Sequence, residues 1–401
     1  MLRNVLSLFL ALSLIAPVIA ARADTITLVR GLVDPTKRHY GDYSCSVGGT
    51  ADGSVVVAEM FARVGGKERG VAYIYPAERR SKRRVEGDPA GYYYAHEVAG
   101  VGDKIVVTNG YGTDVFSQRG KRLRTDRFAS GVAGQTLSLA PMGGEVLIGG
   151  AGWAPGFPSF LIKEVHVVEV ESGNVRLVIR DPSGQPAGET TAFGRGLAGG
   201  EGWIAIGNDL ESGQVEYGGV AYVYDAISGD LLRTLSPPNP TAFDLFGWAL
   251  AIGGGRIYVG APNVDLGATT NAGAVHVFDA ATGDFVETLQ SSHPVDRGHF
   301  GYALAVVGSR IVVGAPGVNI TTLGEAPVGE PPPPYDPYWF GSVDVFDAAT
   351  GVHVGSYRPV DYPYSFGRSV AAAGGNIVVG GGARQFGISQ VAAAEVLAIG
   401  P

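Results

Sequence analysis

The 401-residue sequence contains one cysteine, Cys45, and only 17% of its residues are charged. A single thiol cannot form an internal disulfide, so the stability of the fold must come from packing. Globular proteins usually have about 25% charged residues and about 7% glycine. Here 62 glycines accompany 45% hydrophobic residues, a composition that excludes disorder, collagen and long helical architectures and favours a turn-rich all-β protein.

Enzyme signatures are also missing from the chain. The sequence has no G-x-S-x-G elbow, no H-E-x-x-H helix, no C-x-x-C pair and no phosphate-binding P-loop. No catalytic residue is assigned, and whether the protein is an enzyme stays open, with a non-catalytic role favoured.

Positive charge is scarce in the second half of the chain. The formal net charge is −8, yet residues 1–192 carry 22 Lys and Arg against 19 Asp and Glu, whereas residues 193–401 carry 8 against 19. An acidic protein is a poor partner for nucleic acid. Two basic runs, Arg79–Arg84 and Arg119–Arg127, lie near expected outer strands; they either protect strand edges or attract an anionic polysaccharide or lipopolysaccharide.

The first 23 residues differ from the rest. A short basic start with Arg3 precedes an apolar run from Val5 to Ala20 and small residues around Arg22. This pattern predicts a signal peptide over residues 1–23, cleaved before Asp24, and therefore a secreted or periplasmic protein. The alternative is a retained anchor, although Pro17 and the short run argue against a span. No later segment is apolar enough to cross a membrane.

The sequence repeats itself at intervals of about 54 residues. Copies begin at Phe193, Phe246, Phe300 and Phe366, which are 53, 54 and 66 residues apart. They share Phe-Gly, then a strand such as IYVGAP, then a strand such as GAVHVFD and a turn such as DAATG. Weaker copies begin at Tyr40-Gly41, near Gly91 and near Gly131, so the chain holds seven copies.

Each copy has the alternation of four short antiparallel strands, and one such unit cannot bury both faces of its sheet alone. We therefore predict a single seven-bladed β-propeller over residues 24–401. A parallel β-helix is the alternative, but its repeats are much shorter. The last copy lacks a fourth strand, whereas Thr25–Val29 matches a fourth strand, and His39-Tyr40-Gly41 then aligns with His299-Phe300-Gly301. The N-terminal strand should close the ring.

The Phe-Gly and Gly-Ala-Pro pairs resemble the FG-GAP repeat of integrin α-subunits and of many bacterial secreted proteins. The resemblance implies a seven-bladed propeller used for extracellular binding and cell adhesion. Integrin blades place a D-x-D-x-D-G calcium loop between the two motifs, but here that position holds Gly253–Gly255, Gly308–Arg310 or Gly374–Asn376. These turns offer no carboxylate cage, so we expect no calcium there, no other metal and no cofactor.

Long loops are expected on one face of the disc and tight turns on the other, and recognition residues concentrate on such loops. The largest loop, Gly324–Phe340, combines Pro331–Pro334 with aromatic residues. Prolines stiffen a loop, and aromatic side chains suit sugars or peptides. The aromatic loop candidates are Tyr335, Asp336, Tyr338, Trp339, Tyr362 and Tyr364. They could instead pack against one another over the central channel.

A polar group occupies neighbouring loops of the same face and has side chains suited to acid–base chemistry or metal ligation. Its members are His293, Asp296, Arg297, His299, Asp244 and Asp265. His299 and His39 precede the aromatic–glycine pair in two copies, which favours a structural role. Asp209, Glu211 and Glu216 lack the ligand spacing of an EF-hand.

These observations predict a monomeric binding or adhesion module for an extracellular protein or polysaccharide ligand, acting through the face with the long loops. The alternative is a propeller enzyme, a hydrolase or lyase, that acts on polysaccharide.

Overall fold

The computed structural model describes residues 26–33, 46–59, 63–64, 67–68, 70–77, 82–86, 94–109, 112–127, 137–150, 164–184, 192–212, 214–317, 341–359, 364–382 and 392–400. The described residues form strands and turns and contain no helix. Accordingly, no helix long and apolar enough to cross a membrane occurs in these ranges. Residues 1–23 lie outside them, as does Cys45.

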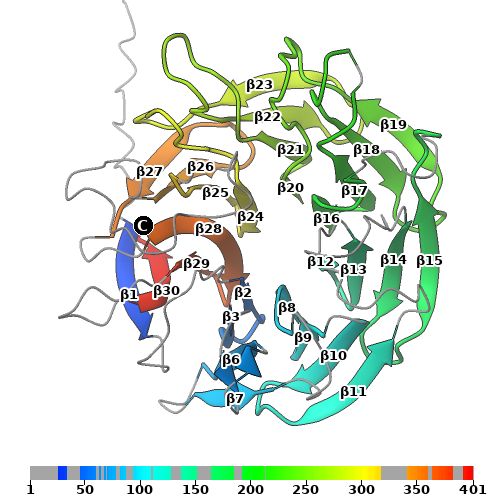
Figure 1. Cartoon of the computed structure of the whole chain (residues 1–401), viewed down its shortest axis with the longest axis vertical. Helices are drawn as coiled ribbons and strands as arrows, with labels where there is room; N and C mark the ends of the chain where they lie inside the picture. The colour runs from blue at the N-terminus through cyan, green and yellow to red at the C-terminus, as the bar shows by residue number, and fades with distance from the viewer. Residues whose placement is uncertain are drawn as a thin grey trace, which may run out of the picture.

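Seven four-stranded antiparallel sheets surround a central axis as the blades of a propeller (Figure 1), which confirms the predicted fold. Blades are numbered along the chain from β2. From the axis outward, blade 1 contains β2 (Val47–Gly49), β3 (Val55–Glu59), β6 (Val71–Tyr75) and β7 (Arg83–Val85). Blade 2 contains β8 (Val98–Val101), β9 (Lys104–Thr108), β10 (Gly112–Ser117) and β11 (Arg122–Arg127). Blade 3 contains β12 (Leu137–Met142), β13 (Glu145–Gly150), β14 (Glu164–Glu169) and β15 (Val175–Arg180). Along the chain, β3 and β6 are connected through a small separate hairpin of β4 (Arg63–Val64) and β5 (Lys67–Glu68).

Blades 4 to 7 follow the same order. They contain β16 (Leu197–Gly200), β17 (Trp203–Asn208), β18 (Val220–Asp225) and β19 (Leu231–Leu235); β20 (Leu250–Gly253), β21 (Arg256–Ala261), β22 (Ala274–Asp279) and β23 (Phe285–Leu289); β24 (Ala303–Val307), β25 (Arg310–Ala315), β26 (Ser342–Asp347) and β27 (His353–Tyr357); and β28 (Tyr364–Ala373), β29 (Asn376–Gly382), β30 (Ala392–Ile399) and β1 (Ile26–Val33).

The N-terminal strand completes the last blade, as predicted. β1 pairs with β30 from Ile26 opposite Ile399 to Val33 opposite Ala392. The observed strand extends beyond the expected Thr25–Val29. Because β1 covers the outer edge of β30, the two ends of the ring are joined by main-chain hydrogen bonds rather than by side-chain packing alone.

The hydrophobic core is divided among the seven interfaces between blades. Each buried cluster joins two neighbours; for example, Val223 of blade 4 packs in one cluster with Phe246 and Ile257 of blade 5. Another cluster joins Leu32 and Val378 of blade 7 to blade 1. Each sheet therefore buries both faces only because it has a neighbour on each side.

The repeated Phe-Gly and Gly-Ala-Pro residues meet across these interfaces. Phe246 is fully buried, and the following Gly247 has a φ of 94°. A side chain at Gly207, in the equivalent of Gly-Ala-Pro on blade 4, would collide with the carbonyl oxygen of Gly247. Gly260 stands in the same relation to Gly301 on the next blade. The motif therefore allows two backbones to touch between blades.

The tight turns between the third and fourth strands, on the face opposite the long loops, are also explained by local chemistry. In the DAATG turn, Asp279 Oδ1 accepts hydrogen bonds from the amides of Ala281 and Thr282, at 3.0 and 2.9 Å. These bonds lower the pKa of Asp279. Gly283 supplies the positive φ of 80° that the turn requires. The repeated aspartate thus has a structural role.

The start of blade 1 differs from the sequence alignment. The amide of Ala58 donates to the carbonyl of Ser46 at 2.9 Å, as the amide of Gly260 donates to Ala249 at 2.8 Å. Ser46 therefore corresponds to Ala249, which lies three residues after Phe246. Counting back three residues from Ser46 gives Tyr43 as the counterpart of Phe246, whereas the sequence alignment gives Tyr40. Residues 34–45, including His39, lie outside the described part of the chain.

Candidate functional site

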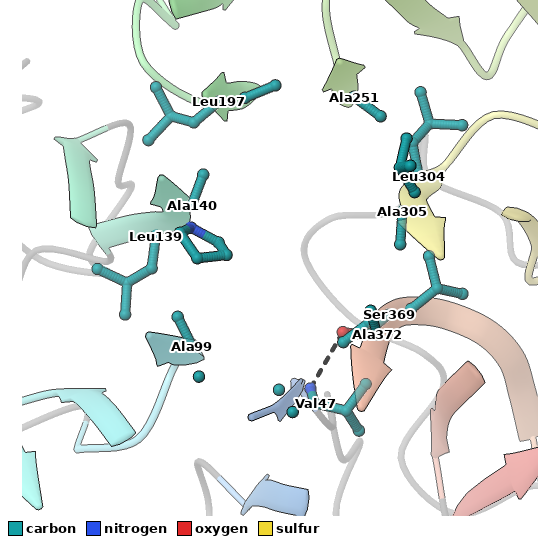
Figure 2. A pocket seen from close by; sticks show the side chains of 18 of the residues that line it. Val47, Ala99, Leu139, Ala140, Leu197, Ala251, Leu304, Ala305, Ser369 and Ala372 are labelled. Carbon is teal, nitrogen blue, oxygen red and sulfur yellow. Dashed lines mark hydrogen bonds between the residues drawn. The ribbon is translucent and has the colours of Figure 1, made fainter. Parts of the chain in front are cut away.

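A central channel runs along the axis of the ring. It has a volume of about 290 Å³ and is lined by residues of all seven inner strands, including Leu197 and Leu304 at equivalent positions (Figure 2). Each inner strand is paired on only one side, so its free backbone edge faces the channel and needs water or a ligand as partner. The channel is therefore an opening lined by apolar side chains and by the free edges of the inner strands.

Polar lining residues occur at only two positions in the described channel wall, Glu97 and Ser369. Ser369 Oγ accepts a hydrogen bond from the amide of Val47 at 3.1 Å, which joins blades 7 and 1 (Figure 2). Glu97 and Ser369 both lie three residues after the aromatic residue of their copies. Glu97 directly precedes β8, and the continuous pairing of β28 with β29 starts at Ser369. This end of the channel is its mouth.

Five half-buried side chains surround the mouth, each two residues after the repeated aromatic residue. This set, the mouth ring, consists of His96, Arg195, Trp248, Tyr302 and Arg368. Inner strands run from the mouth toward the tight turns, and the second strands return to the mouth before the longer loops. The mouth ring therefore lies on the face that the sequence predicts for ligand binding.

Two aromatic side chains lie between two cationic ones along the mouth ring from blade 4 to blade 7. The Arg195 guanidinium carbon lies 4.5 Å from the centre of the Trp248 indole. The Trp248 and Tyr302 rings are 5.1 Å apart and tilted by 51°. The Arg368 guanidinium carbon lies 5.8 Å from the Tyr302 ring centre. Cation–π attraction holds such an arc together.

The two arginines differ in their charge partners. Arg195 Nη1 lies 3.3 Å from Oδ2 of Asp209, whose side chain is fully buried. Burial raises the pKa of Asp209, and the charge of Arg195 opposes that shift. Arg368 has no carboxylate within ion-pair distance among the described residues. Its charge is therefore available to a ligand, whereas Arg195 is held in place beside Trp248.

Glu97 and His96 face Arg368 from blade 2. His96 Nδ1 lies 3.9 Å from Glu97 Oε1, and Ser46 Oγ donates to Glu97 Oε2 at 2.6 Å. Burial raises the pKa of Glu97 to about 7, although the Ser46 bond and the charge of Arg368 oppose the shift. Burial and the charge of Arg368 lower the pKa of His96 to about 4.

Two predicted polar candidates are buried away from the mouth. His299 is fully buried; its Nδ1 donates to the carbonyl of Pro262 at 3.0 Å, and burial lowers its pKa to about 4. Asp244 is 3% exposed and accepts hydrogen bonds from the amide and hydroxyl of Thr241 at 2.7 and 2.5 Å. Both residues shape the connections between blades.

The other polar candidates lie on two adjoining loops. Asp265 Oδ1 accepts from the amide of Asn271 at 2.7 Å, and Asp296 Oδ1 accepts from the amide of Thr270 at 2.9 Å. The amide of Arg297 donates to the Thr270 carbonyl at 2.7 Å. The structure thus brings Asp265, Asp296 and Arg297 together, with both carboxylates used to shape the loops.

His293 is exposed, and its Nδ1 lies 3.0 Å from the hydroxyl of Ser292. In the described ranges, no group of three or more His, Cys, Asp or Glu side chains is arranged to hold a metal ion. The predicted aromatic loop residues Tyr335, Asp336, Tyr338, Trp339 and Tyr362 lie outside these ranges, and Tyr364 belongs to β28.

Sequence reasoning missed the mouth ring, although a signal for it exists. Copies that read FGRGLA, FGWALA, FGYALA and FGRSVA keep most positions similar and vary the third. A position that varies among Arg, Trp and Tyr inside a repeated frame indicates a role other than packing. Only closure of the ring shows that these side chains converge.

The comparisons with known proteins agree with the fold. The family model of the FG-GAP repeat matches residues 231–278. This segment begins at the outer strand of blade 4 and ends in the third strand of blade 5, so it includes one Phe-Gly pair and one Gly-Ala-Pro run, which contact blades 4 and 6, respectively. No curated protein matches the sequence significantly.

Proposed function

The chain is a seven-bladed propeller with FG-GAP repeats, and we propose that it is a binding module whose ligand is a polysaccharide bearing carboxylate groups. The mouth ring is the observation that carries this proposal. The expected signal peptide over residues 1–23 supports a secreted or periplasmic location, where such polymers are met.

The chemistry of the mouth ring fits an acidic sugar. Half-exposed Trp248 and Tyr302 offer broad amphipathic surfaces to a pyranose ring. Arg368 offers a guanidinium that can bind a carboxylate with two hydrogen bonds. Residues 193–401 contain only 8 Lys and Arg, and Arg195 and Arg368 are two of them. Their position at the mouth supports recognition of an anion.

Calorimetry with oligogalacturonate, and with a neutral galacto-oligosaccharide as its matched ligand, tests the proposal. Trp248→Ala should weaken binding of the acidic ligand by roughly 2 kcal/mol, as for an aromatic anchor. Arg368→Gln should reduce the preference for the acidic ligand, while Arg358→Gln removes an exposed charge at the end of an outer strand and should leave binding unchanged. Equal binding of both ligands by all three variants and the parent would contradict the proposal.

The predicted loop residues remain candidates for an extended site. Trp339→Ala should weaken binding by roughly 2 kcal/mol if this side chain contacts the ligand, with little change in melting temperature. If Trp339 instead packs into the protein, the same substitution should cost about 3 to 5 kcal/mol of stability. Binding and melting measured on one variant separate the two roles.

A second candidate function is cleavage of the bound polysaccharide. It is favoured by Glu97 and His96, whose pKa values move in opposite directions, so that a protonated carboxyl and a neutral imidazole coexist between about pH 4 and pH 7. Such pairs serve acid–base catalysis. Incubation with oligogalacturonate should then release new reducing ends, and Glu97→Gln should abolish their release without preventing binding.

A further inference from the structure

Basic side chains gather on the outer rim where blades 1 and 2 meet. β7 and β11 are the outermost strands of these blades and lie next to each other in Figure 1. A side chain at Gly120, in the turn before β11, would lie 3.1 Å from Cβ of Arg83. Arg122 Nη2 donates to the carbonyl of Glu86, just after β7. The cations of the two blades therefore form one surface.

Some of these cations are neutralised and others are not. Arg84 Nε lies 3.0 Å from Glu86 Oε1, and Arg122 Nη2 lies 3.3 Å from Asp114 Oδ2. Exposed Arg83, Arg119 and Lys121 have no ion-pair partner in the described part of the chain. We call these three residues the rim strip.

The neighbouring blade shows the opposite arrangement. On β15, Arg176 Nε lies 2.5 Å from Glu145 Oε1, and Arg180 Nε lies 3.0 Å from Glu164 Oε1. Paired cations of this kind leave little net charge on the rim of blade 3. Among the described outer strands and turns, the cluster of cations without an ion-pair partner therefore lies on blades 1 and 2.

Protection of strand edges does not explain the rim strip. Charged side chains on an outer strand discourage pairing with other chains, but the outer strands β19, β23 and β27 have among them a single Arg or Lys, Arg233. These edges are exposed in the same way. A cluster of cations at one place exceeds what the edges of this ring need.

We propose that the rim strip binds a sulfated or otherwise densely anionic polysaccharide chain. Charge alone draws the ligand, because the nearby aromatic rings are covered: Tyr73 is buried beneath Lys82 at 5.2 Å, and Phe116 beneath Arg122 at 5.4 Å. The site is separate from the mouth ring, and the proposal does not rest on the function proposed for that ring.

The shape of the rim favours a polysaccharide over duplex DNA. The outer strands of the ring form a convex surface (Figure 1), and the remaining blades carry an excess of acidic residues. Duplex DNA is stiff, with a persistence length of about 50 nm, so it would touch a convex rim over a short length and face acidic blades beyond it. A flexible polysaccharide can follow the strip.

Dextran sulfate, neutral dextran and a short DNA duplex are suitable probes for calorimetry across a range of salt concentrations. The double variant Arg83→Gln/Lys121→Gln should bind dextran sulfate about tenfold more weakly or worse and lower the salt slope by about two. The matched control Arg297→Gln/Arg358→Gln removes two exposed charges that have no ion-pair partner among the described residues, and it should bind as the parent does. The Arg83→Gln/Lys121→Gln variant should still bind oligogalacturonate as the parent does, which separates this test from that of the mouth ring.

Three results would overturn the proposal. The first is no binding of dextran sulfate by the parent at low ionic strength. The second is an equal loss in both double variants, which would show attraction to charge anywhere on the surface. The third is binding of the duplex as tightly as dextran sulfate with the same sensitivity to Arg83→Gln/Lys121→Gln, which would assign the strip to nucleic acid. Equal melting temperatures of the two double variants confirm that both are folded.

Discussion

In blade 5 the amide of Gly247 donates to the carbonyl of Gly260 at 3.1 Å, and in blade 2 the amide of Ala95 donates to the carbonyl of Thr108 at 2.8 Å. Tyr94 replaces Phe246 and is 1% exposed, compared with 0% for the phenylalanine. The same hydrogen bond and the same buried ring thus occur where neither glycine is kept. What repeats around this propeller is this backbone hydrogen bond together with the buried aromatic ring, a combination that we call the frame. The FG-GAP residues are one set of side chains that forms the frame.

The two halves differ more in charge than in frame. Blades 4 to 6 have few basic residues, and Arg195 lies at the mouth, whereas blades 1 and 2 hold an uncompensated basic rim. A frame that tolerates substitution leaves each blade free to carry different surface chemistry.

The largest effect should come from opening the ring where β1 pairs with β30, which we call the seam. Deleting residues 24–33 removes β1, leaves the edge of β30 unpaired and removes buried Leu32. We expect a stability loss of roughly 4 kcal/mol or more, beyond that of common single substitutions, and loss of a single cooperative unfolding transition. The control deletes only residues 1–23. A melting temperature equal to that of the control would show that the seam contributes nothing.

The next effect compares the two versions of the frame directly. At Gly247, whose φ is 94°, an added Cβ would lie 2.5 Å from the carbonyl oxygen of Val220. Gly247→Ala should cost roughly 2 to 4 kcal/mol through strain and overpacking. Ala95 already holds a φ of 57°, so Ala95→Gly should change stability by less than about 1 kcal/mol.

Urea unfolding of both variants checks this comparison. Equal losses would show that blade 2 depends on its alanine as strongly as blade 5 depends on its glycine. In that case the frame would not be interchangeable between the halves, even though the hydrogen bonds are the same.

The fold could be predicted from the sequence because the strands, turns and repeat length are local features of each copy. Ring closure was predictable too, since Thr25–Val29 supplies the strand that the last copy lacks. The mouth ring could not be found in the same way. Trp248 and Arg368 are 120 residues apart, and nothing in either copy alone distinguishes an axial side chain from an exposed one. Convergence is a property of the closed ring.

A smaller effect should appear in the pH dependence of stability. Glu97 occupies the position that Ala249 holds in blade 5, and burial raises its pKa to about 7 from its usual value near 4.5. The folded state therefore binds the Glu97 proton more tightly than the unfolded state does. This contribution is fully present below pH 4.5 and is lost as the pH rises through about 7.

Glu97→Gln isolates this effect because other titrating groups remain in both proteins. The difference in the free energy of unfolding between parent and variant should change progressively between about pH 4.5 and 7. The parent should become less stable relative to the variant as the pH rises. Ionised Glu97 also opposes an anionic ligand near Arg368, so parent affinity for oligogalacturonate should fall above pH 7. A difference curve that is flat with pH would show that Glu97 is an ordinary solvated carboxylate.

The smallest expected effect is that of calcium removal. In blades 5 and 7 the turns between the first and second strands contain Gly254 and Gly255, and Gly374 and Gly375, all at positive φ, and provide no carboxylates where integrin blades hold calcium. The turns of blades 1, 2 and 4 contain one acidic residue each, Asp52, Asp103 and Glu201, which is too few for a calcium cage. A chelator should therefore leave the melting temperature of the full chain unchanged, in the C-terminal blades and the N-terminal blades alike. A site occupied at a hundred times its dissociation constant would contribute about 2.7 kcal/mol, which a thermal scan detects readily. A fall of several degrees in EDTA that calcium restores would place a calcium cage in other loops, and repeating the scan on the deletion of residues 24–33 would show whether it depends on the seam.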